Sequence, residues 1–532
     1  MPSSPRTLPA LLRAAAEAYG DAPAYVEGTA TLSYRDLLEQ VRRAAAHYHS
    51  TGLADGDRVV IWAPNSTGWA VAALAVTYAG GVLVPANSRY TGHEVAELVD
   101  RTHARIVVVE DGFLGRSQVA DLRAAGDLST VLAVLDLADL PRWSSSERPG
   151  GSWSSSERPG ARWSSSERSE RPVETTPPDI DQVADRVSPD DVADILFTSG
   201  TTGRPKGAMS AHRQTIGVAE VWAGLGGVTG TDRYLVVNPF FHSFGYKIGI
   251  VVGLLTGAAL YPVATFDVEE TMRLVQEAGI TALPGAPTIF QSLLAAASRP
   301  SYDLSTLRLA VTGAAVVPVV LIERMRAPSP EGLGIDQVVT AFGMTEAVVA
   351  TMCRQDDPAE LVATTCGRAV PGMETRIGDR GELLLRGDHV MLGYLDDPEA
   401  TAAAIDEDGW LHTGDVGTLD ERGNLTITDR LKDMYICGGF NVYPAEVEQV
   451  LLRHEGVHDV AVVGVPDERL GEVGRAYVVR ADDALQADEV TAFARERLAN
   501  FKVPREVTFV DVLPRNLSGK ILKAELRDGV VK

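Results

Sequence analysis

The chain has 532 residues and a formal net charge of −23 at pH 7. This length exceeds one ordinary core, and a hydrophobic content of 45% with 23% charged residues is typical of a globular protein. So acidic a chain disfavours binding to nucleic acid, which needs clustered Lys and Arg. The three cysteines, Cys353, Cys366 and Cys437, are too scattered for a disulfide framework or a Cys-x-x-Cys metal site. They favour a reducing compartment, and with no apolar secretion signal near Met1 we expect a cytoplasmic protein.

Helix-like and strand-like segments alternate from residue 8 to about residue 140. Residues 34–49 form an amphipathic pattern, 58–62 and 105–109 are apolar runs typical of buried strands, and 69–78 is again helical. Alternation of this kind predicts βαβ units with mostly parallel sheets, so the expected fold class is α/β.

A low-complexity repeat lies between residues 143 and 172. The motif Trp-Ser-Ser-Ser-Glu-Arg begins at Trp143, Trp153 and Trp163, and one Trp per ten residues cannot close a core. We expect a disordered surface insertion; the alternative is a partner-binding segment with periodic Trp anchors.

A loop rich in glycine and hydroxyl groups follows the apolar run 194–197. Its glycines allow backbone N–H groups to surround an anion, its hydroxyls add donors, and Lys206 adds charge. The Walker pattern is excluded because Pro205 stands where that pattern needs glycine. The loop therefore predicts a triphosphate site, with a Ser/Thr/Gly linker as the alternative.

The second half of the chain contains three kinds of sequence pattern. The longest apolar stretch, 248–263, is interrupted by glycines and is expected to be a buried core helix, too short to span a membrane. Short strands with Gly/Asp turns around 382–387 and 424–427 predict a small β unit, and an α+β module follows residue 443. We expect a large lobe over 1–430 and a mobile small lobe over 431–532.

Six further motifs occur in a fixed order, and together with the glycine loop they resemble the adenylate-forming superfamily of acyl-CoA synthetases, peptide-synthetase adenylation domains and luciferases. They are FFHSFG at 240–245, TAFGMTE at 340–346, WLHTGD at 410–415, DRLKD at 429–433, GGFNVYPAE at 438–446 and LPRNLSGK at 513–520. The resemblance covers nearly the whole chain. It implies an ATP-dependent ligase that forms an acyl adenylate and then an acyl-CoA thioester.

The resemblance also assigns roles to individual residues. Lys520 and Lys206 are the implied catalytic cations, with His242 as a gate between the ATP and acyl sites. Lys432 is the implied hinge, and Gly438 and Gly439 would line the tunnel for coenzyme A. The implied nucleotide ligands are Thr198, Ser199, Gly200, Thr201, Thr202, Gly203, Gly313, Ala314, Ala315, Phe342, Gly343, Thr345, Asp415 and Arg430. The motif departs from the family at Phe342, where tyrosine is commoner, and at Asp429, where glycine is commoner.

Each implied role has a plainer alternative. Glu346, with Thr201, is the implied Mg²⁺ ligand, but it could instead cap a helix after Thr345. Asp415 could be a turn residue and Lys520 part of a solvated tail. His242 could be a core histidine.

The carboxylic acid is the least constrained part of the prediction. His242, Gly245, Lys247 and Ala341 are the expected acyl-site residues, with Gly245 and Gly249 leaving room for a bulky acid and Lys247 meeting a polar atom on it or extending to solvent. Residues 238–247 and 311–318 resemble actinobacterial ligases that activate the indane-propanoate fragment of steroid degradation. A medium- or long-chain fatty acyl-CoA ligase and an inactive adenylate-binding scaffold are the alternatives. A homodimer is possible, and no integral membrane segment is expected.

Overall fold

A computed structural model of the protein gives the following architecture. It describes residues 5–125, 128–142, 179–198, 205–313, 317, 319–431, 433–437, 440–467, 469–498, 500–515 and 520–527. The expected insertion at 143–172 lies outside these residues. The chain divides into two compact units: Met1–Asp267 with Ala278–Leu283 and Met391–Pro398, and Val268–Glu277 with Pro284–Val390 and Glu399–Lys532.

The first unit contains a largely parallel sheet in the order β18-β8-β7-β4-β3-β5-β6. Strands β3, β4 and β5 are buried along most of their length, which explains their uninterrupted apolar sequences. The strands of this sheet are β3 (Arg58–Trp62), β4 (Val82–Pro85), β5 (Ile106–Val109), β6 (Ala133–Asp136), β7 (Val192–Phe197), β8 (Gly207–Ala211) and β18 (Gly393–Tyr394). β8 runs antiparallel to both β7 and β18.

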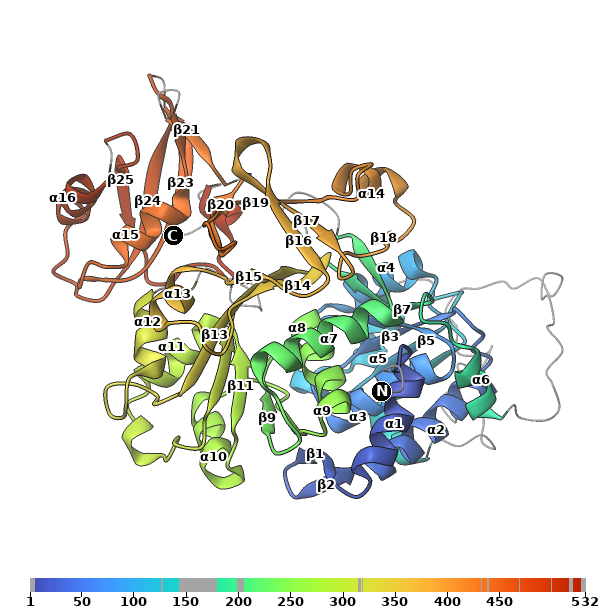
Figure 1. Cartoon of the computed structure of the whole chain (residues 1–532). Coiled ribbons are helices and arrows are strands. Elements are labelled where there is room, and N and C mark those ends of the chain that lie inside the picture. Colours follow the sequence, from blue (N-terminus) through green and yellow to red (C-terminus); the bar gives the residue numbers. More distant parts are fainter. Residues whose placement is uncertain are drawn as a thin grey trace. The chain divides into compact units, whose positions relative to one another are not determined.

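Helices pack beside this sheet, and a second group of strands completes the unit. The helices α1, α2 and α3 pack on one another next to β3 (Figure 1). The main helices are α1 (Leu8–Tyr19), α2 (Tyr34–Ser50), α3 (Thr67–Tyr78), α4 (Gly92–Thr102), α5 (Gln118–Ala125), α6 (Ile180–Arg186), α7 (His212–Gly226), α8 (Ser243–Gly245) and α9 (Val252–Thr256). The second group of strands is β1 (Pro23–Glu27), β2 (Ala30–Ser33), β9 (Arg233–Val236), β10 (Ala259–Pro262) and β11 (Ala282–Gly285).

The apolar stretch 248–263 is not one helix, so that expectation was wrong. A π-helix covers Tyr246–Val251, α9 ends at Thr256, and the rest of the stretch enters β10. Gly257 ends the helix because it adopts a left-handed conformation with φ of 78°, which costs glycine little.

The second unit begins with α10 and contains α/β elements, a small antiparallel sheet and a C-terminal α+β module. Its elements before the small sheet are α10 (Val268–Ala278), α11 (Pro287–Ala295), β12 (Leu309–Thr312), α12 (Val319–Arg326), β13 (Gln337–Met344), β14 (Ala347–Met352), α13 (Ala359–Thr364) and β15 (Arg368–Ala369). The small sheet has the order β16-β17-β19-β20, with α14 (Pro398–Ala404) before β19. Its strands are β16 (Met373–Ile377), β17 (Glu382–Gly387), β19 (Leu411–Leu419) and β20 (Leu425–Arg430).

The C-terminal module has a hydrophobic core of its own, drawn from residues between Tyr435 and Leu526. In its long hairpin β23–β24, the strand β24 also pairs with β21 and with β25. The elements are β21 (Tyr435–Cys437), β22 (Phe440–Val442), α15 (Pro444–Leu451), β23 (Val457–Asp467), β24 (Gly471–Arg480), α16 (Ala487–Arg497), β25 (Glu506–Phe509) and α17 (Lys523–Arg527). The mixed α/β class is confirmed, whereas the lobe boundary at residue 430 stays a prediction.

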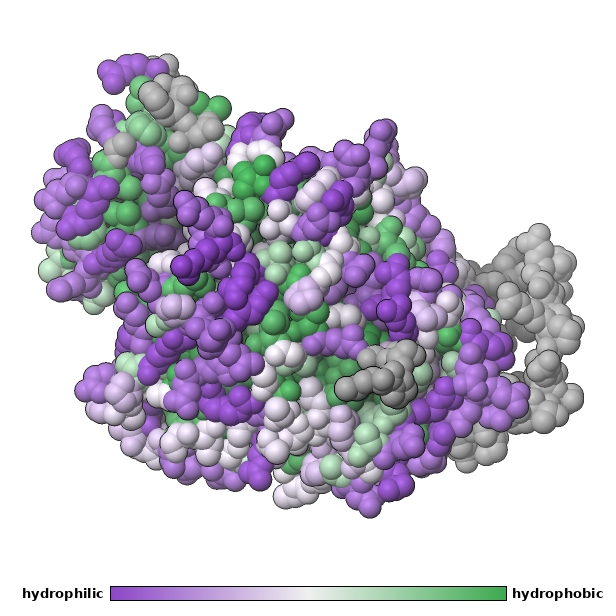
Figure 2. Space-filling model, in the orientation of Figure 1, coloured by the Kyte–Doolittle hydropathy of each residue, from purple (hydrophilic) through white to green (hydrophobic). Residues whose placement is uncertain are grey.

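Hydrophilic residues predominate on the face shown in Figure 2, as a net charge of −23 leads one to expect. No helix in the described part of the chain is long and apolar enough to cross a membrane.

Candidate active site

The hairpin β7–β8 brackets the glycine-rich loop. The Thr198 N–H donates to the Lys206 carbonyl oxygen at 2.9 Å, which closes the base of the loop. Lys206 is exposed, and its Nζ lies 4.9 Å from the centroid of the Tyr394 ring in β18. Residues 199–203, the expected phosphate ligands, lie outside the described residues. The hairpin thus presents one cation at the base of this loop.

His242 is the N-cap residue of the short helix α8. Its Nδ1 accepts a hydrogen bond from the Phe244 N–H at 3.1 Å, which requires an unprotonated Nδ1. Burial lowers the His242 pKa from its ordinary value, in agreement with that role. The side chain is therefore neutral at pH 7 and fits a gate better than an added cation.

Gly245 lies against the loop that precedes it, and its expected place in the acyl site stays a prediction. A Cβ at Gly245 would overlap the backbone carbonyls of Pro239 and Asn238, so the missing side chain lets α8 pack against its own preceding loop. At Gly249 a Cβ would lie 3.2 Å from Val236 Cγ1, already a tight contact. At both glycines the protein itself occupies the direction that a side chain would take.

Lys247 is buried and does not extend to solvent, contrary to one of its two expected fates. Its Nζ donates to Ser210 Oγ at 2.7 Å and forms an ion pair with Asp194 Oδ1 at 3.1 Å. Its ammonium is thus engaged by the protein in this structure. The sequence analysis did not identify Asp194 as the partner of Lys247. A carboxylate inside the apolar strand β7 was nevertheless a signal, because a buried carboxylate needs a partner.

The end of β13 and the turn between β13 and β14 hold several of the residues expected to bind the nucleotide and Mg²⁺. Thr345 and Glu346 occupy this turn, and Glu346 is buried. Because a strand follows Glu346, the alternative that it caps a helix is wrong. Phe342 is half-buried on β13, where it pairs with Thr351.

Backbone segments approach each other closely around this turn. A Cβ at Gly313 would lie 2.7 Å from the Ala341 carbonyl oxygen, so the structure places the end of β12 directly against β13. A Cβ at Gly343 would lie 2.5 Å from the Val349 N atom. Val349 itself has a φ of 56°, which is strained for a β-branched residue. Ala314 and Ala315 lie outside the described residues.

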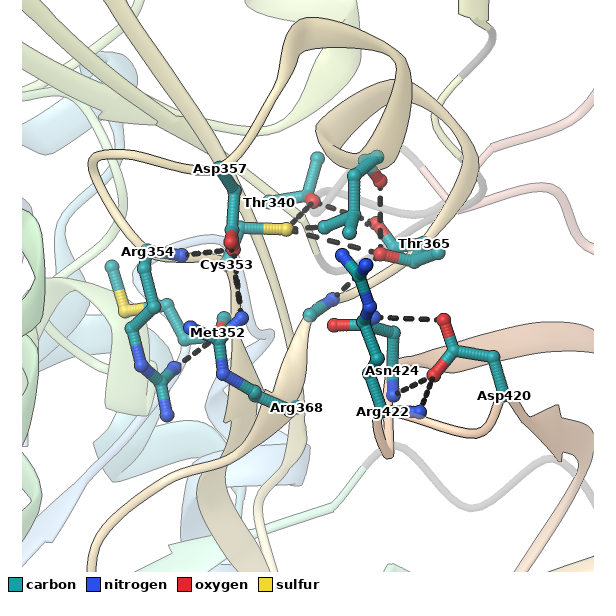
Figure 3. A network of polar contacts seen from close by, with 12 residues as sticks. Thr340, Met352, Cys353, Arg354, Asp357, Thr365, Arg368, Asp420, Arg422 and Asn424 are labelled. Carbon is teal, nitrogen blue, oxygen red and sulfur yellow. Dashed lines mark hydrogen bonds and ion pairs between the residues drawn. The ribbon is translucent and has the colours of Figure 1, made fainter.

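A polar network behind β13 supports this turn, and sequence reasoning did not find it (Figure 3). The Thr340 hydroxyl donates to the Thr365 carbonyl oxygen at 2.8 Å, and the Cys353 N–H donates to the Thr340 carbonyl oxygen at 2.9 Å. Arg368 forms an ion pair with Asp357 at 3.0 Å in the same network. These contacts fix the strand immediately before Ala341 and Phe342.

Asp415 is a buried carboxylate within β19, which argues against an ordinary turn residue. Its N–H donates to Thr413 Oγ1 at 3.0 Å, and that hydroxyl donates to the Leu383 carbonyl oxygen at 2.7 Å. Arg430 lies opposite Asp415 on β20. The structure therefore brings together two of the residues expected to contact the ribose, although the Arg430 side chain lies outside the described part.

None of the cysteines is poised as a nucleophile. Burial raises the pKa of the Cys366 thiol to about 12, with Cys353 and Asp415 adding to the effect. Burial also raises the pKa of Cys353 and of Cys437. All three thiols are therefore mostly protonated at pH 7.

Lys520 is partly exposed in the segment before α17. Both flanks of this segment are anchored to the C-terminal module. Arg515 forms an ion pair with Asp459 at 2.6 Å, and Lys523 forms one with Glu448 at 2.8 Å. Lys432, Gly438 and Gly439 lie outside the described residues, so the hinge and tunnel roles stay predictions.

These features are those expected of an enzyme that uses a nucleotide and has a C-terminal module with its own core, and comparisons with known proteins identify the family. The AMP-binding enzyme family matches residues 12–395, and its C-terminal domain matches residues 446–520. The chain belongs to the AMP-binding enzyme family. It is an AMP-forming acyl-CoA ligase, a class that uses ATP and coenzyme A.

Curated relatives span essentially the whole chain. The chain is 54% identical over 533 residues to the 3-[(3aS,4S,7aS)-7a-methyl-1,5-dioxo-octahydro-1H-inden-4-yl]propanoyl:CoA ligase of Rhodococcus jostii (strain RHA1), covering 99% of both chains. It is 51% identical to the Mycobacterium tuberculosis (strain ATCC 25618 / H37Rv) ligase of the same name, covering 98% of this chain and 99% of that one. Among solved structures, ATP-bound MatB from Rhodopseudomonas palustris has a TM-score of 0.82 at 28% identity, covering 98% and 99%.

Proposed function

We propose that this enzyme activates a propanoate side chain carried on an indane-type bicyclic ring, as expected for steroid degradation. The observation that carries the proposal is 54% and 51% identity, over nearly the full length, to two ligases named for such an acid. The substrate is then a carboxylic acid with a bulky alicyclic group, and the products are its CoA thioester, AMP and pyrophosphate.

In the proposed first step the carboxylate attacks the α-phosphate of ATP and expels pyrophosphate. Two anions must meet, so cations are needed where negative charge accumulates. Lys206 at the base of the glycine loop would contact the departing phosphates, and Lys520 would bridge the carboxylate and the α-phosphate. Asp415 would accept hydrogen bonds from the ribose, and Phe342 would stack on adenine.

Mg²⁺ fits the chemistry of the β13–β14 turn. No group of three or more His, Cys, Asp or Glu is arranged as a metal site among the residues that the structure describes. A single buried carboxylate, Glu346, suits Mg²⁺, which keeps waters and phosphate oxygens as most of its ligands. Bound there with Thr201, the ion would supply positive charge beside the phosphates.

In the proposed second step the thiol of coenzyme A displaces AMP. The buried thiols of the protein are unsuited to this attack, which supports delivery of the thiol by coenzyme A. Lys520 is not needed for this step, and Gly438 and Gly439 would line the pantetheine tunnel after the C-terminal lobe rotates near Lys432. A neutral His242 would separate the ATP and acyl sites without attracting either anion.

The cytoplasmic location and the homodimer belong to the same proposal. Free cysteines at 353, 366 and 437 support a reducing compartment. Size-exclusion chromatography with light scattering tests the dimer directly.

Pyrophosphate release tests the function. The purified full chain is incubated with ATP, Mg²⁺ and single acids: an indane propanoate, a saturated bicyclic propanoate and fatty acids of medium and long chain. We expect kcat/KM to be highest for the indane propanoate. A preference for fatty acids would favour the alternative suggested by 30% identity to the Bacillus subtilis (strain 168) long-chain-fatty-acid–CoA ligase. No release with any acid would indicate an inactive adenylate-binding protein.

A further inference from the structure

In the first unit, a buried charge pair joins the β7–β8 hairpin to the segment that follows His242. Lys247 is 1% exposed and Asp194 is 0% exposed, and their Nζ and Oδ1 atoms lie 3.1 Å apart. Ser210 Oγ accepts a second bond from Nζ at 2.7 Å, and Thr215 Oγ1 donates to Asp194 Oδ2 at 2.7 Å. Lys247 Nζ and Asp194 Oδ2 each have a hydrogen bond, whereas Asp194 Oδ1 has no hydrogen-bond partner and meets Lys247 through the ion pair alone.

The cluster connects two segments that carry expected site residues, one for the phosphates and one for the carboxylic acid. Asp194 and Ser210 lie directly opposite each other in the hairpin β7–β8, whose strands lead to Thr198 and from Lys206. Lys247 comes from the π-helix that follows His242. One ammonium thus connects the hairpin that carries the glycine loop with the segment that carries the proposed gate.

The backbone around Lys247 is unusual in a way that agrees with a special role. A π-helix is rare and is found frequently at functional sites. Here it covers Tyr246–Val251, so it sets the direction in which Lys247 leaves the backbone. Tyr246 is buried beside the pair, and both burial and the Asp194 carboxylate raise its pKa.

Two buried charges are a costly way to obtain stability alone. Desolvation offsets much of the attraction within such a pair, and well-packed apolar residues often stabilise a fold equally well. What a charged pair adds is one defined geometry. If Lys247 moved away from Asp194, a buried charge would be left without its counter-charge. This reasoning favours a role in positioning.

We propose that Asp194 and Lys247 form a positioning pair that fixes the His242 segment relative to the β7–β8 hairpin, so that the carboxylate and the triphosphate meet in the geometry needed for adenylation. The proposal rests on the proposed adenylation reaction but not on the identity of the acid. Neither residue is assigned contact with a reacting atom.

The test compares Lys247→Met, Asp194→Asn and the double variant in the full-length enzyme. Single variants leave a buried charge unpaired and are expected to lower Tm. The double variant removes both charges at nearly constant volume and is expected to recover much of that Tm. Arg42→Met is the matched control, because Arg42 pairs with Asp181 at 2.7 Å in the same unit and has no proposed role in the site.

Kinetics then separate positioning from stability. Enzyme concentration is set by titration of active sites, and initial rates of pyrophosphate release are measured over ranges of ATP and acid. We expect the double variant to keep a kcat at least tenfold below wild type and a raised KM for the acid despite its recovered Tm. Arg42→Met should keep both values even if its Tm falls.

Three outcomes would overturn the proposal. If the double variant recovers kcat and KM along with Tm, the pair only stabilises the fold. If Lys247→Met impairs acids with a ring ketone but not the saturated bicyclic acid, Lys247 contacts the substrate. If the double variant keeps a low Tm and a wild-type KM, the pair is again only structural. Inactivity of the wild-type enzyme toward every acid would instead refute the proposed function.

Discussion

Asp415 lies directly opposite Arg430 in the antiparallel pair formed by β19 and β20. A strand register holds two facing residues within about 5 Å at their Cα atoms. The pairing turns two separate sequence motifs, WLHTGD and DRLKD, into neighbours. It supports the assignment of both residues to the ribose.

Asp415→Asn should weaken ATP binding while leaving the fold intact. Hydrogen bonds to charged groups contribute about 1.5–3 kcal/mol, so we expect the KM for ATP to rise roughly tenfold to hundredfold. Asp420→Asn is the matched control, because Asp420 accepts hydrogen bonds from Arg422 and Asn424 in the turn of the same hairpin. It should lower Tm slightly without changing this KM. Equal effects of the two substitutions would contradict a ribose contact.

Lys520→Ala should separate the two half-reactions. Loss of the cation that bridges carboxylate and α-phosphate is expected to slow formation of the acyl adenylate by orders of magnitude. Conversion of a supplied acyl adenylate and coenzyme A to thioester should stay near the wild-type rate. Lys523→Ala is the control, since Lys523 contacts Glu448 and is expected to affect stability alone. An equal loss in both half-reactions would refute the assigned role.

Several helices and strands followed from local patterns, although 248–263 did not, and the contacts of the site could not be read from the sequence. The periodicity of 34–49 and the apolar run 58–62 predicted α2 and β3 nearly to the residue. The partner of Lys247 lies 53 positions earlier in the chain, at Asp194, and nothing local to either residue names the other. Pairing across a sheet and between a helix and a sheet is a property of the fold, so sequence alone left Lys247 with two expected fates, of which solvent exposure was wrong.

The role of a glycine is also difficult to predict from the sequence, because it depends on which distant atoms lie beside it. The motif singled out Gly245, but the sequence alone could not show that its missing side chain makes room for the Pro239 carbonyl. The π-helix at Tyr246–Val251 was equally hidden, since its sequence matches an ordinary apolar helix. The C-terminal module was easier to predict because its helices and strands alternate with clear periods.

Gly245→Ala should be strongly destabilising. The added Cβ would overlap the Pro239 carbonyl, and a backbone atom cannot move away as a flexible side chain can. Overpacking of this kind costs about 1–3 kcal/mol or more. Gly224→Ala offers the contrast, because Gly224 lies within α7 and a Cβ there meets nothing within 4 Å. It should raise the free energy of unfolding by about 0.5–1 kcal/mol. Urea denaturation measures both changes, and a tolerated Gly245→Ala would contradict the close contact.

His212 should make the protein less stable in mild acid. Burial lowers the pKa of His212 to about 4, although Asp191 opposes part of the shift. Its Nδ1 accepts a hydrogen bond from the Leu8 N–H at 3.2 Å, so protonation of this atom would remove an acceptor inside the core. An unfolded chain binds this proton near pH 6.5, well before the folded one does.

The sign of the pH dependence follows from these two values. Between about pH 6.5 and pH 4 the unfolded state binds more protons at His212, so the free energy of unfolding falls as the pH falls and levels off below pH 4. The loss at this residue is on the order of 3 kcal/mol. His212→Gln keeps an acceptor but cannot be protonated, so its free energy of unfolding should fall less between pH 7.5 and pH 4.5 than that of wild type. His458→Gln, at an exposed position, should follow wild type. Parallel pH profiles for wild type and His212→Gln would show that burial of His212 does not oppose its protonation.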